Sequence, residues 1–378
     1  MAQANGKGAA SALVIGGGIA GMSAALSLTE AGVKVRLIDR DPQWRVYGAG
    51  ITITGPTLRV MKRLGILEDA LREGHAADGL LACDVEGNVV AEIGTNGVDG
   101  GEYPGAGGIM RPTLHGILAA RVRAAGIDVL LGRRVTEIAP GRPKRVIFDD
   151  GTLGSYDLVV GADGIFSDTR RMLFPEVGAP QYVGQVCWRL MTKRDPRIER
   201  RTYFLGGPCK VGMNPVSSAE MYMFLLEPQA QFQRVADDKL HIRLNELMEP
   251  YGGVVGATRE KLSPESNIVA RPLETVFVPK PWHRDRVLLI GDAAHATTPQ
   301  LASGAGMAME DGVVLGECIA FSPDIDEALA LFMQRRFDRC ALVVDKSLTL
   351  GRLEKSGATP LEQVRVVEDA LRQLNQAY

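Results

Sequence analysis

The sequence predicts an α/β protein in which a Rossmann-like dinucleotide-binding domain carries an inserted, mainly β domain and ends in a helical C-terminal segment. Three observations support this fold class. An apolar run near the N-terminus leads into a glycine-rich turn and a helical pattern. Strand-like periodicity replaces that pattern between about residues 181 and 268, and a buried-strand pattern returns after about residue 271. Alternation of these patterns is typical of a doubly wound domain with an insertion.

The first unit begins with residues 12–15, an apolar run with the length of a buried strand. Gly16, Gly18 and Gly21 follow in the pattern G-x-G-x-x-G. In this pattern the first glycine permits the tight turn, the second lets the backbone approach a pyrophosphate, and the third lets the helix pack closely. A helix is expected to follow and to end near Gly32.

A second strand is predicted from the alternation at residues 33–37, and it leads to Asp39, which lies 23 residues after Gly16. A carboxylate at this place can accept hydrogen bonds from ribose hydroxyls. The alternative is a glycine-rich turn without a ligand. No second G-x-G-x-x-G follows a strand, so the sequence predicts one dinucleotide site, and a nicotinamide coenzyme would have no Rossmann site of its own.

Composition excludes several classes of protein. The 378 residues carry a formal charge of −2 with basic residues spread along the chain, which gives no support for nucleic-acid binding. No apolar stretch reaches the length of about 18 residues that a membrane span needs, and residues 1–11 are expected to be a disordered leader. The five cysteines are odd in number and lack disulfide or metal-ligand spacing, which favours a cytoplasmic location: Cys83, Cys187, Cys209, Cys318 and Cys340.

The remaining elements follow from periodicity. A helix is expected over residues 57–73 with an interruption near Gly65, another over 110–125, a hairpin at the Asp150-Gly151 turn, and a helix near 237–249. The predicted boundaries are 12–76, 105–178 and 271–345 for the dinucleotide-binding domain, 77–104 and 179–270 for the inserted substrate domain, and 346–378 for the C-terminal helical segment.

Three motifs carry a resemblance to a known family. They are GGGIAG at residues 16–21, DLVVGADGIFSDTRR at 157–171, and RVLLIGDAAHATTPQLASGAGMAMEDG at 286–312. In this order they resemble the motifs of the single-component FAD-dependent aromatic hydroxylases, the para-hydroxybenzoate hydroxylase-like flavin monooxygenases, over residues 12 to about 345. The chain resembles the compact salicylate, hydroxynicotinate and urate hydroxylase type, because no further domain is expected after the last helix.

The resemblance implies a set of FAD contacts. Asp163 and Gly164 support the pyrophosphate region, Asp292 accepts a hydrogen bond from a ribityl hydroxyl, and Pro299 lines the flavin ring. The helix that begins near Gly304 points its free N–H groups toward the negative charge of reduced flavin. The complete set expected at the FAD is Gly16, Gly18, Ile19, Ala20, Gly21, Asp39, Arg40, Gly50, Arg111, Val135, Asp163, Gly164, Asp292, Pro299, Gly304, Ala305 and Gly306. No metal site is expected.

Several residues depart from the family pattern or permit a simpler role. The family commonly has Gly where Ala302 stands and Asn where Gly306 stands; an alanine is tolerated unless its φ is positive. Asp163 could cap the following helix. His295 could act as an acid or base, but a structural hydrogen bond is the more ordinary role for it.

The resemblance also implies the reaction. NADH or NADPH reduces FAD, dioxygen adds to it, and a flavin C4a-hydroperoxide hydroxylates a small aromatic or N-heteroaromatic substrate. Substrate contacts are expected from the inserted domain, where Trp188 and Met213 are also candidates, although each could be an ordinary packed or solvated sheet residue. The candidate catalytic residues are Tyr222, Arg189, Lys210 and His295.

Two other functions remain open at this stage. A flavin-dependent halogenase shares the fold, but its W-x-W-x-I-P signature is absent, since Trp44, Trp188 and Trp282 lie far apart. A non-enzymatic FAD-binding redox protein would show the same cofactor motifs but would not consume NAD(P)H with oxygen. The protein is expected to be a monomer or a homodimer, and the sequence does not name the substrate or choose between NADH and NADPH.

Overall fold

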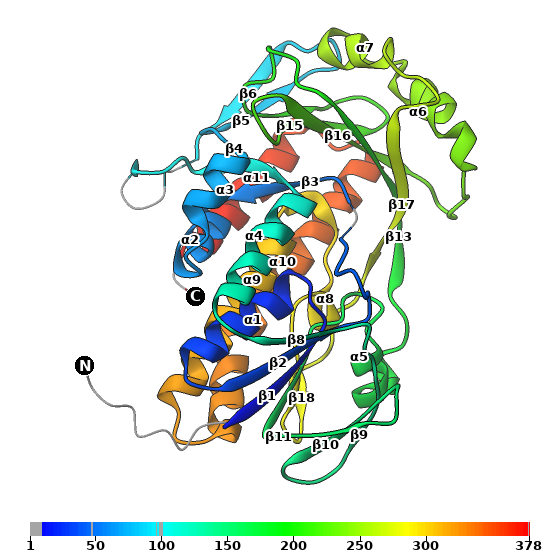
Figure 1. The fold of residues 1–378 in the computed structure, drawn as a ribbon. Coiled ribbons are helices and arrows are strands. Elements are labelled where there is room, and N and C mark those ends of the chain that lie inside the picture. The colour runs from blue at the N-terminus through cyan, green and yellow to red at the C-terminus, as the bar shows by residue number, and fades with distance from the viewer. Residues whose placement is uncertain (1–9, 47, 96, 98–100, 377) are drawn as a thin grey trace.

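The computed structural model describes residues 10–46, 48–95, 97, 101–376 and 378 (Figure 1). Its first sheet has six strands in the order β18-β19-β12-β1-β2-β8, all parallel except β18. This sheet is the predicted Rossmann-like layer, which confirms the α/β fold class. The strands are β1 (Ser11–Ile15), β2 (Lys34–Asp39), β8 (Asp128–Leu131), β12 (Leu158–Gly161), β18 (His283–Arg284) and β19 (Val287–Leu289).

The helices beside this sheet form the middle of the molecule (Figure 1). They include α1 (Ile19–Glu30), α4 (Arg111–Ala124), α9 (Gly304–Phe321) and α10 (Ile325–Ser356). Because Gly312 has no side chain, α9 packs closely against α1. A Cβ atom at this position would lie 2.5 Å from the backbone of α1. The apolar faces of these helices and of the sheet share one core.

The second sheet has seven strands in the order β17-β13-β16-β15-β14-β5-β6. All neighbours are antiparallel except β14 and β5. Helices α6 (Leu240–Met248) and α7 (Gly253–Arg259) cover its outer side, where they enclose a separate hydrophobic core. The strands are β5 (Leu80–Cys83), β6 (Val89–Ile93), β13 (Gln181–Lys193), β14 (Arg201–Phe204), β15 (Lys210–Pro215), β16 (Glu220–Pro228) and β17 (Asn267–Thr275).

Two three-stranded sheets and several short elements complete the described chain. One sheet has the order β3-β7-β4 and the other β11-β10-β9. Their strands are β3 (Gly50–Thr54), β4 (His75–Ala76), β7 (Ala106–Met110), β9 (Val135–Ala139), β10 (Lys144–Phe148) and β11 (Leu153–Tyr156). The short helices are α2 (Gly55–Arg63), α3 (Leu67–Glu73), α5 (Asp168–Leu173), α8 (Asp292–His295), η2 (Pro175–Val177), η3 (Asp237–Lys239) and η4 (Pro299–Leu301), and α11 (Pro360–Leu374) follows α10.

The predicted helices and strands agree with this arrangement except at α7, at the boundary at residue 345 and near the N-terminus. The helical pattern of residues 57–73 is broken at Gly65 into α2 and α3, as expected. α7 was not predicted, because it is short and has a glycine at its start and another in its interior. The predicted boundary at residue 345 falls inside the continuous helix α10. The predicted leader lies outside the described residues up to residue 9, and β1 already begins at Ser11.

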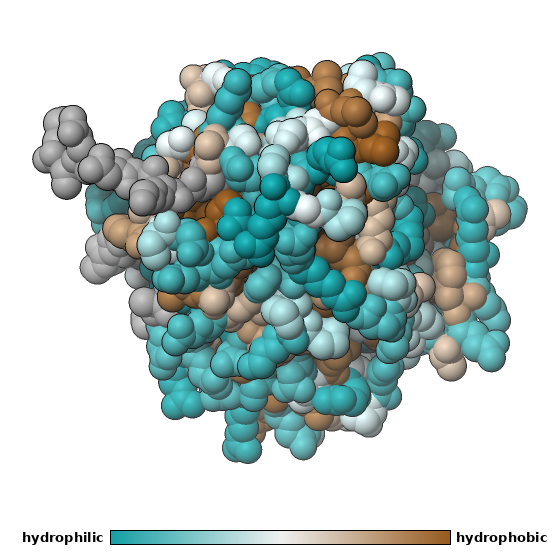
Figure 2. All heavy atoms as spheres, turned by 90° about the horizontal axis from the view of Figure 1, so that it is seen from below, coloured by the Kyte–Doolittle hydropathy of each residue, from teal (hydrophilic) through white to brown (hydrophobic). Residues whose placement is uncertain are grey.

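The surface has no continuous hydrophobic face in the view of Figure 2, where hydrophilic residues predominate and hydrophobic ones form separate patches. Among the helices that the structure describes, none combines the length and the apolar character that crossing a bilayer requires.

Candidate FAD and substrate site

The glycine-rich turn connects β1 to α1 in the way that the sequence predicts. Gly16 has φ +108°, which disfavours any residue with a side chain. A side chain at Gly21 would meet the carbonyl oxygen of Gly16 at 1.8 Å, so its absence lets α1 approach the turn. The N–H of Gly17 donates to Oδ2 of Asp39 at 2.7 Å. The end of β2 therefore holds the turn, and the open backbone at Gly18 fits a pyrophosphate.

Two residues that the sequence analysis did not single out support this turn. Trp44 Nε1 donates to the carbonyl oxygen of Gly17 at 2.9 Å. Nε2 of His115 lies 3.2 Å from the same oxygen, and its ring meets the Trp44 ring edge-on. Trp44 lies in a loop and His115 lies inside α4, so no sequence pattern indicates that both contact the same oxygen.

The middle motif is folded around the carboxylate of Asp163. Oδ1 accepts from the hydroxyl of Ser167, and Oδ2 accepts from the N–H and the hydroxyl of Thr169 at 2.9 and 3.0 Å. These are contacts at the start of α5, so the structure supports the alternative in which Asp163 stabilises the helix start. Gly164 has φ +80° and open space where a side chain would be.

Arg170 joins the middle motif to the late motif, a role that the sequence analysis missed. Its side chain is buried, and Nη1 donates to the carbonyl oxygen of Ala293 at 3.0 Å. Nη2 donates to the carbonyl oxygen of Ile165 at 2.6 Å. Two segments that are far apart in sequence are thereby fixed next to each other.

Asp292, Arg111 and Arg189 are charged but have no hydrogen bond or ion pair with any described residue; we call them the unpaired charges. Asp292 and Arg111 are accessible to solvent, yet desolvation by the surrounding protein is the largest cause of the pKa shift of each. Burial raises the pKa of Asp292, and Arg111 opposes that rise. Burial also lowers the pKa of Arg111, which Asp292 opposes and Arg189 reinforces. The three groups therefore share one electrostatic environment.

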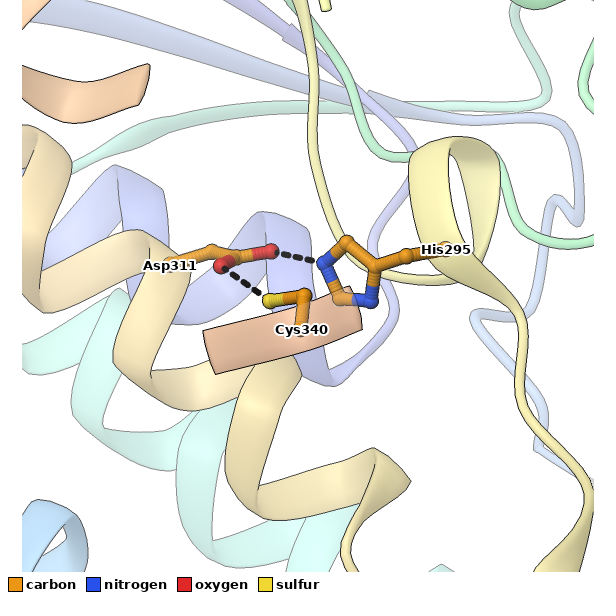
Figure 3. Close-up of side chains that lie close together, drawn as sticks. All are labelled: His295, Asp311 and Cys340. Carbon is orange, nitrogen blue, oxygen red and sulfur yellow. Dashed lines mark hydrogen bonds and ion pairs between the residues drawn. The ribbon is translucent and has the colours of Figure 1, made fainter. Parts of the chain in front are cut away.

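His295 follows Asp292 by three residues, and its side chain points toward Asp311 and Cys340 (Figure 3). Its Nε2 is 2.6 Å from Oδ2 of Asp311, and its ring lies 4.9 Å from that of Trp282, between centroids. Oδ2 of Asp311 also accepts from the N–H of Gly291 at 2.8 Å, so this carboxylate fixes the turn that precedes Asp292. His295 is buried and paired, which favours the structural role over acid–base catalysis.

Arg336 completes this buried group. Nε donates to Asp311 Oδ1 at 2.8 Å and Nη1 donates to Glu310 Oε2 at 2.6 Å. Arg339 adds two further hydrogen bonds to Glu310. We call His295, Glu310, Asp311, Arg336 and Arg339 the paired cluster.

Ionisation in the paired cluster follows from these contacts. Burial alone would raise the pKa of Asp311, but His295 and Arg336 lower it to about 2. Burial alone would lower the pKa of His295, but Cys340 and Asp311 raise it well above its ordinary value. Potential ligand atoms of His295, Asp311 and Cys340 lie within 4.8 Å of one another. The guanidinium of Arg336 donates into the same group, which opposes the binding of a metal cation.

The turn from Pro299 into α9 contains both departures from the family pattern. Ala302 has φ +53°, the conformation in which an alanine is strained. A side chain at Gly306 would meet Oγ1 of Thr57 at 2.4 Å, so Thr57 occupies the space that an asparagine would need. Gly304 and Ala305 form the first turn of α9, as predicted.

Lys210 already has a partner within the protein. Its Nζ donates to Oε1 of Glu354 in α10 at 3.0 Å, and both side chains are buried. Although burial alone would lower the pKa of Lys210, Glu354 raises it. Gln300 donates to Gln185 at 3.0 Å and to Glu354 at 3.2 Å. The ion pair thus joins the second sheet to α10 and to the turn at Pro299, which favours a structural role for Lys210.

Tyr222 lies on the inner face of the second sheet, and its ring is packed against Gly50 at the start of β3. Its hydroxyl is 2.7 Å from Oγ1 of Thr52, which also accepts a hydrogen bond from Asn214 Nδ2 at 3.1 Å. Burial raises the pKa of Tyr222 to about 12. A neutral phenol is therefore present at neutral pH.

Arg189 is near Tyr222, whereas Trp188 and Met213 point the opposite way. Both are buried in the core beneath α6 and α7, and Trp188 Nε1 donates to Glu227 at 2.8 Å. This placement corrects the expectation that they contact the substrate: successive residues of a strand face opposite sides.

The other predicted FAD contacts lie in the connections of the first sheet and in the sheet β11-β10-β9. Ile19 and Ala20 form the first turn of α1, the exposed Arg40 follows β2, and Val135 is buried at the start of β9. Their contacts with FAD stay predictions.

Comparison with known proteins identifies the class of enzyme. Residues 9–328 match the family described as FAD binding domain, so the chain belongs to that family. It is a FAD-dependent monooxygenase of the aromatic hydroxylase type, which confirms the predicted family, enzyme class and cofactor.

Three similar proteins illustrate the range of relatives. The chain is 32% identical to 2-heptyl-3-hydroxy-4(1H)-quinolone synthase of Pseudomonas aeruginosa (strain UCBPP-PA14), with 90% of this chain and 88% of the relative covered. It is 27% identical to 3-hydroxybenzoate 6-hydroxylase of Klebsiella oxytoca, with 90% and 88% covered. Its structure resembles that of Klebsiella pneumoniae HpxO complexed with FAD and uric acid, with a TM-score of 0.81, 25% identity, and 96% and 92% covered.

Proposed function

We propose that the chain uses NADH or NADPH and dioxygen to hydroxylate a small aromatic or heteroaromatic compound that carries an acidic group. The observation that carries this proposal is the pair of unpaired guanidinium groups, Arg111 and Arg189, which influence each other electrostatically. Two positive charges beside the single carboxylate of Asp292 leave a net positive site. An anionic ligand group balances it.

We assign Arg111 and Asp292 to FAD and Arg189 to the substrate. The open turn at Gly18, the solvent-accessible Asp292 and the first turn of α9 fit the pyrophosphate, the ribityl chain and the ring of FAD in that order. Bound FAD supplies the redox chemistry. Arg189 would bind the acidic group of the substrate and fix the ring, while the neutral hydroxyl of Tyr222 and its partner Thr52 form one wall.

The similar proteins support the substrate class. The names of the relatives refer to a hydroxybenzoate and a quinolone, and the structural neighbour was solved with uric acid. All three are planar ring systems. We also propose a cytoplasmic enzyme that is a monomer or homodimer, supported by five buried cysteines that form no disulfide among the described residues.

A paired screen tests this function. Aromatic acids and their uncharged primary amides would be compared for acceleration of NADH and NADPH oxidation with matching oxygen uptake. We expect an acid to be active and its amide to be much weaker. If no compound accelerates coenzyme oxidation, the enzymatic function is wrong and the redox-protein alternative is favoured.

Variants of Arg189 test its assignment. Arg189→Gln should raise KM for the acid by about tenfold or more, since a hydrogen bond to a charged group contributes about 1.5–3 kcal/mol. It should change KM for the amide far less. Lys193→Gln removes a charge from the exposed end of the same strand and serves as the matched control. Equal effects on acid and amide would contradict the assignment.

A further inference from the structure

A second cavity of about 350 Å³ lies at the other end of β3, between α2, β7, β14 and α11. None of the predicted FAD contacts and none of the unpaired charges lines it. This volume is within the range of pockets that hold small ligands. Its apolar wall is formed by Pro56, Ile93, Ala106 and Leu371.

Arg201, on β14, lines this cavity and is only 6% exposed. Its side chain makes no ion pair or hydrogen bond with any residue that the structure describes, and its buried Nε has no partner. The guanidinium lies over the ring of Tyr203, 5.6 Å from the centroid. The nearby Lys210 is also positive and already paired with Glu354. A buried cation without a counter-ion is costly, so the cavity favours an anion.

The start of α2 forms another wall of the same cavity through Thr54, Gly55 and Pro56. This helix has nine residues, and no side chain caps its N-terminus. Pro56 has no N–H, but the N–H of Gly55 and the helix dipole add positive potential on the side from which Arg201 also acts. The rim carries Glu368 and Arg372 on α11, and Arg372 pairs with Asp369 at 2.7 Å. Glu368 therefore leaves one negative charge at the rim, but it is exposed and forms no ion pair with Arg201, so the buried guanidinium has no counter-ion among the described residues.

We propose that this cavity binds a small organic carboxylate, with its head between Arg201 and the first turn of α2 and its apolar part against Pro56, Ile93 and Leu371. The site is separate from the FAD and substrate site, and the proposal does not depend on the function proposed above.

Calorimetric titration of the full-length, FAD-loaded protein with sodium hexanoate tests the proposal, with inorganic phosphate as a parallel arm. An aliphatic acid is the probe because it has no aromatic ring to occupy the place of the substrate. We expect saturable hexanoate binding and at least about tenfold weaker phosphate binding, since only hexanoate buries apolar surface.

Arg201→Gln should weaken hexanoate binding by about tenfold or more, because it removes a charge-assisted hydrogen bond. Arg200→Gln is the matched control: it changes the same charge one residue earlier, where the arginine pairs with Glu92 outside the cavity. Leu371→Trp should also abolish binding, because it fills the cavity from α11 without changing charge. This second variant keeps the test valid if Arg201→Gln does not fold.

Three results would overturn the proposal. The first is no saturable hexanoate binding to the unaltered protein. The second is binding that Arg189→Gln removes and Arg201→Gln leaves intact, which would place hexanoate in the substrate site. The third is phosphate binding as tight as that of hexanoate, which would show that the apolar wall takes no part.

Discussion

The late motif contributes Asp292 to the unpaired charges and His295, Glu310 and Asp311 to the paired cluster, and the two groups differ in whether their charges have partners within the protein. Within the paired cluster, Asp311 meets His295, Arg336 and the backbone of Gly291 at hydrogen-bond distance. Asp292, at the unpaired charges, is solvent-accessible and hydrogen-bonds to no described side chain. A complete set of partners fixes the backbone in the protein alone, whereas an incomplete set is completed by ligands. We therefore propose that the paired cluster fixes the backbone of the site and that the unpaired charges bind its ligands.

The largest effect is expected from breaking the paired cluster. Asp311→Asn keeps the shape of the side chain but leaves Arg336 and protonated His295 without their shared carboxylate. Removing one partner of a buried ion pair costs about 3–5 kcal/mol. The free energy of unfolding from urea denaturation should fall by that amount. Asp128→Asn, which removes an exposed ion pair with Arg36, is the control and should change the free energy of unfolding little. Similar losses in the two variants would show that the buried ion pairs contribute no more than an exposed one.

The second prediction is that variants of Asp292 and His295 differ in their effects on FAD binding and on stability. Asp292→Ala should weaken FAD binding by at least about tenfold, because a carboxylate that accepts a hydrogen bond contributes about 1.5–3 kcal/mol. His295→Ala should weaken FAD binding less but should lower the free energy of unfolding, which Asp292→Ala should not. FAD fluorescence titration and urea denaturation measure the two quantities. Equal loss of FAD in both variants would show that His295 supports FAD binding as much as Asp292 does.

The free energy of unfolding, measured over a series of pH values, tests the ionisation of Asp311 and His295. Asp311, with a pKa lowered to about 2, stabilises the fold above its unfolded pKa of about 3.9 and loses that effect as pH falls toward 2. His295, with a raised pKa, stabilises the fold fully below about pH 6.5 and loses that effect as pH rises through its folded pKa. Both contributions are complete only between about pH 4 and 6.5.

The stability difference between the unaltered protein and His295→Gln should therefore be largest near pH 5–6. Above about pH 6.5 it should narrow, by about 1.4 kcal/mol for each unit by which folding raises the pKa of His295. Asp311, Cys340 and the ring of Trp282 are the neighbours that set this behaviour. Urea denaturation at pH 5, 6, 7 and 8 measures it. A constant difference would mean that folding does not shift the pKa of His295, and a difference that widens with rising pH would mean that folding lowers this pKa.

Sequence reasoning predicted the local geometry of the candidate site where a short pattern determines structure. The turn at Gly16 and the end of β2 at Asp39 follow from spacing within one βαβ unit, and the structure brings them together. The preference for a structural His295 followed from ordinary roles of histidine, and its buried pair supports it.

Long-range partners could not be predicted in the same way. Lys210 and Glu354 are 144 residues apart, and Tyr222 and Thr52 are 170 apart. Periodicity shows that such residues lie in strands or helices but not which of them meet. The inner and outer faces of β13 were also indistinguishable, so Trp188 and Arg189 were both expected at the substrate although only Arg189 is on that side.

The smallest expected effect concerns Ala302, in the turn that leads from Pro299 to α9 and so toward Asp311. The family usually has glycine here, and alanine is strained at φ +53°. A left-handed conformation costs an alanine about 1–2 kcal/mol, while a glycine loses about 0.5–1 kcal/mol more backbone entropy on folding. Ala302→Gly should therefore raise the free energy of unfolding by about 0.5 kcal/mol. Ala305→Gly, three residues later inside α9, should lower it, because glycine disfavours a helix. Urea denaturation of the two variants side by side measures both signs. A loss of stability in both would mean that the Ala302 methyl group makes contacts that outweigh its strain.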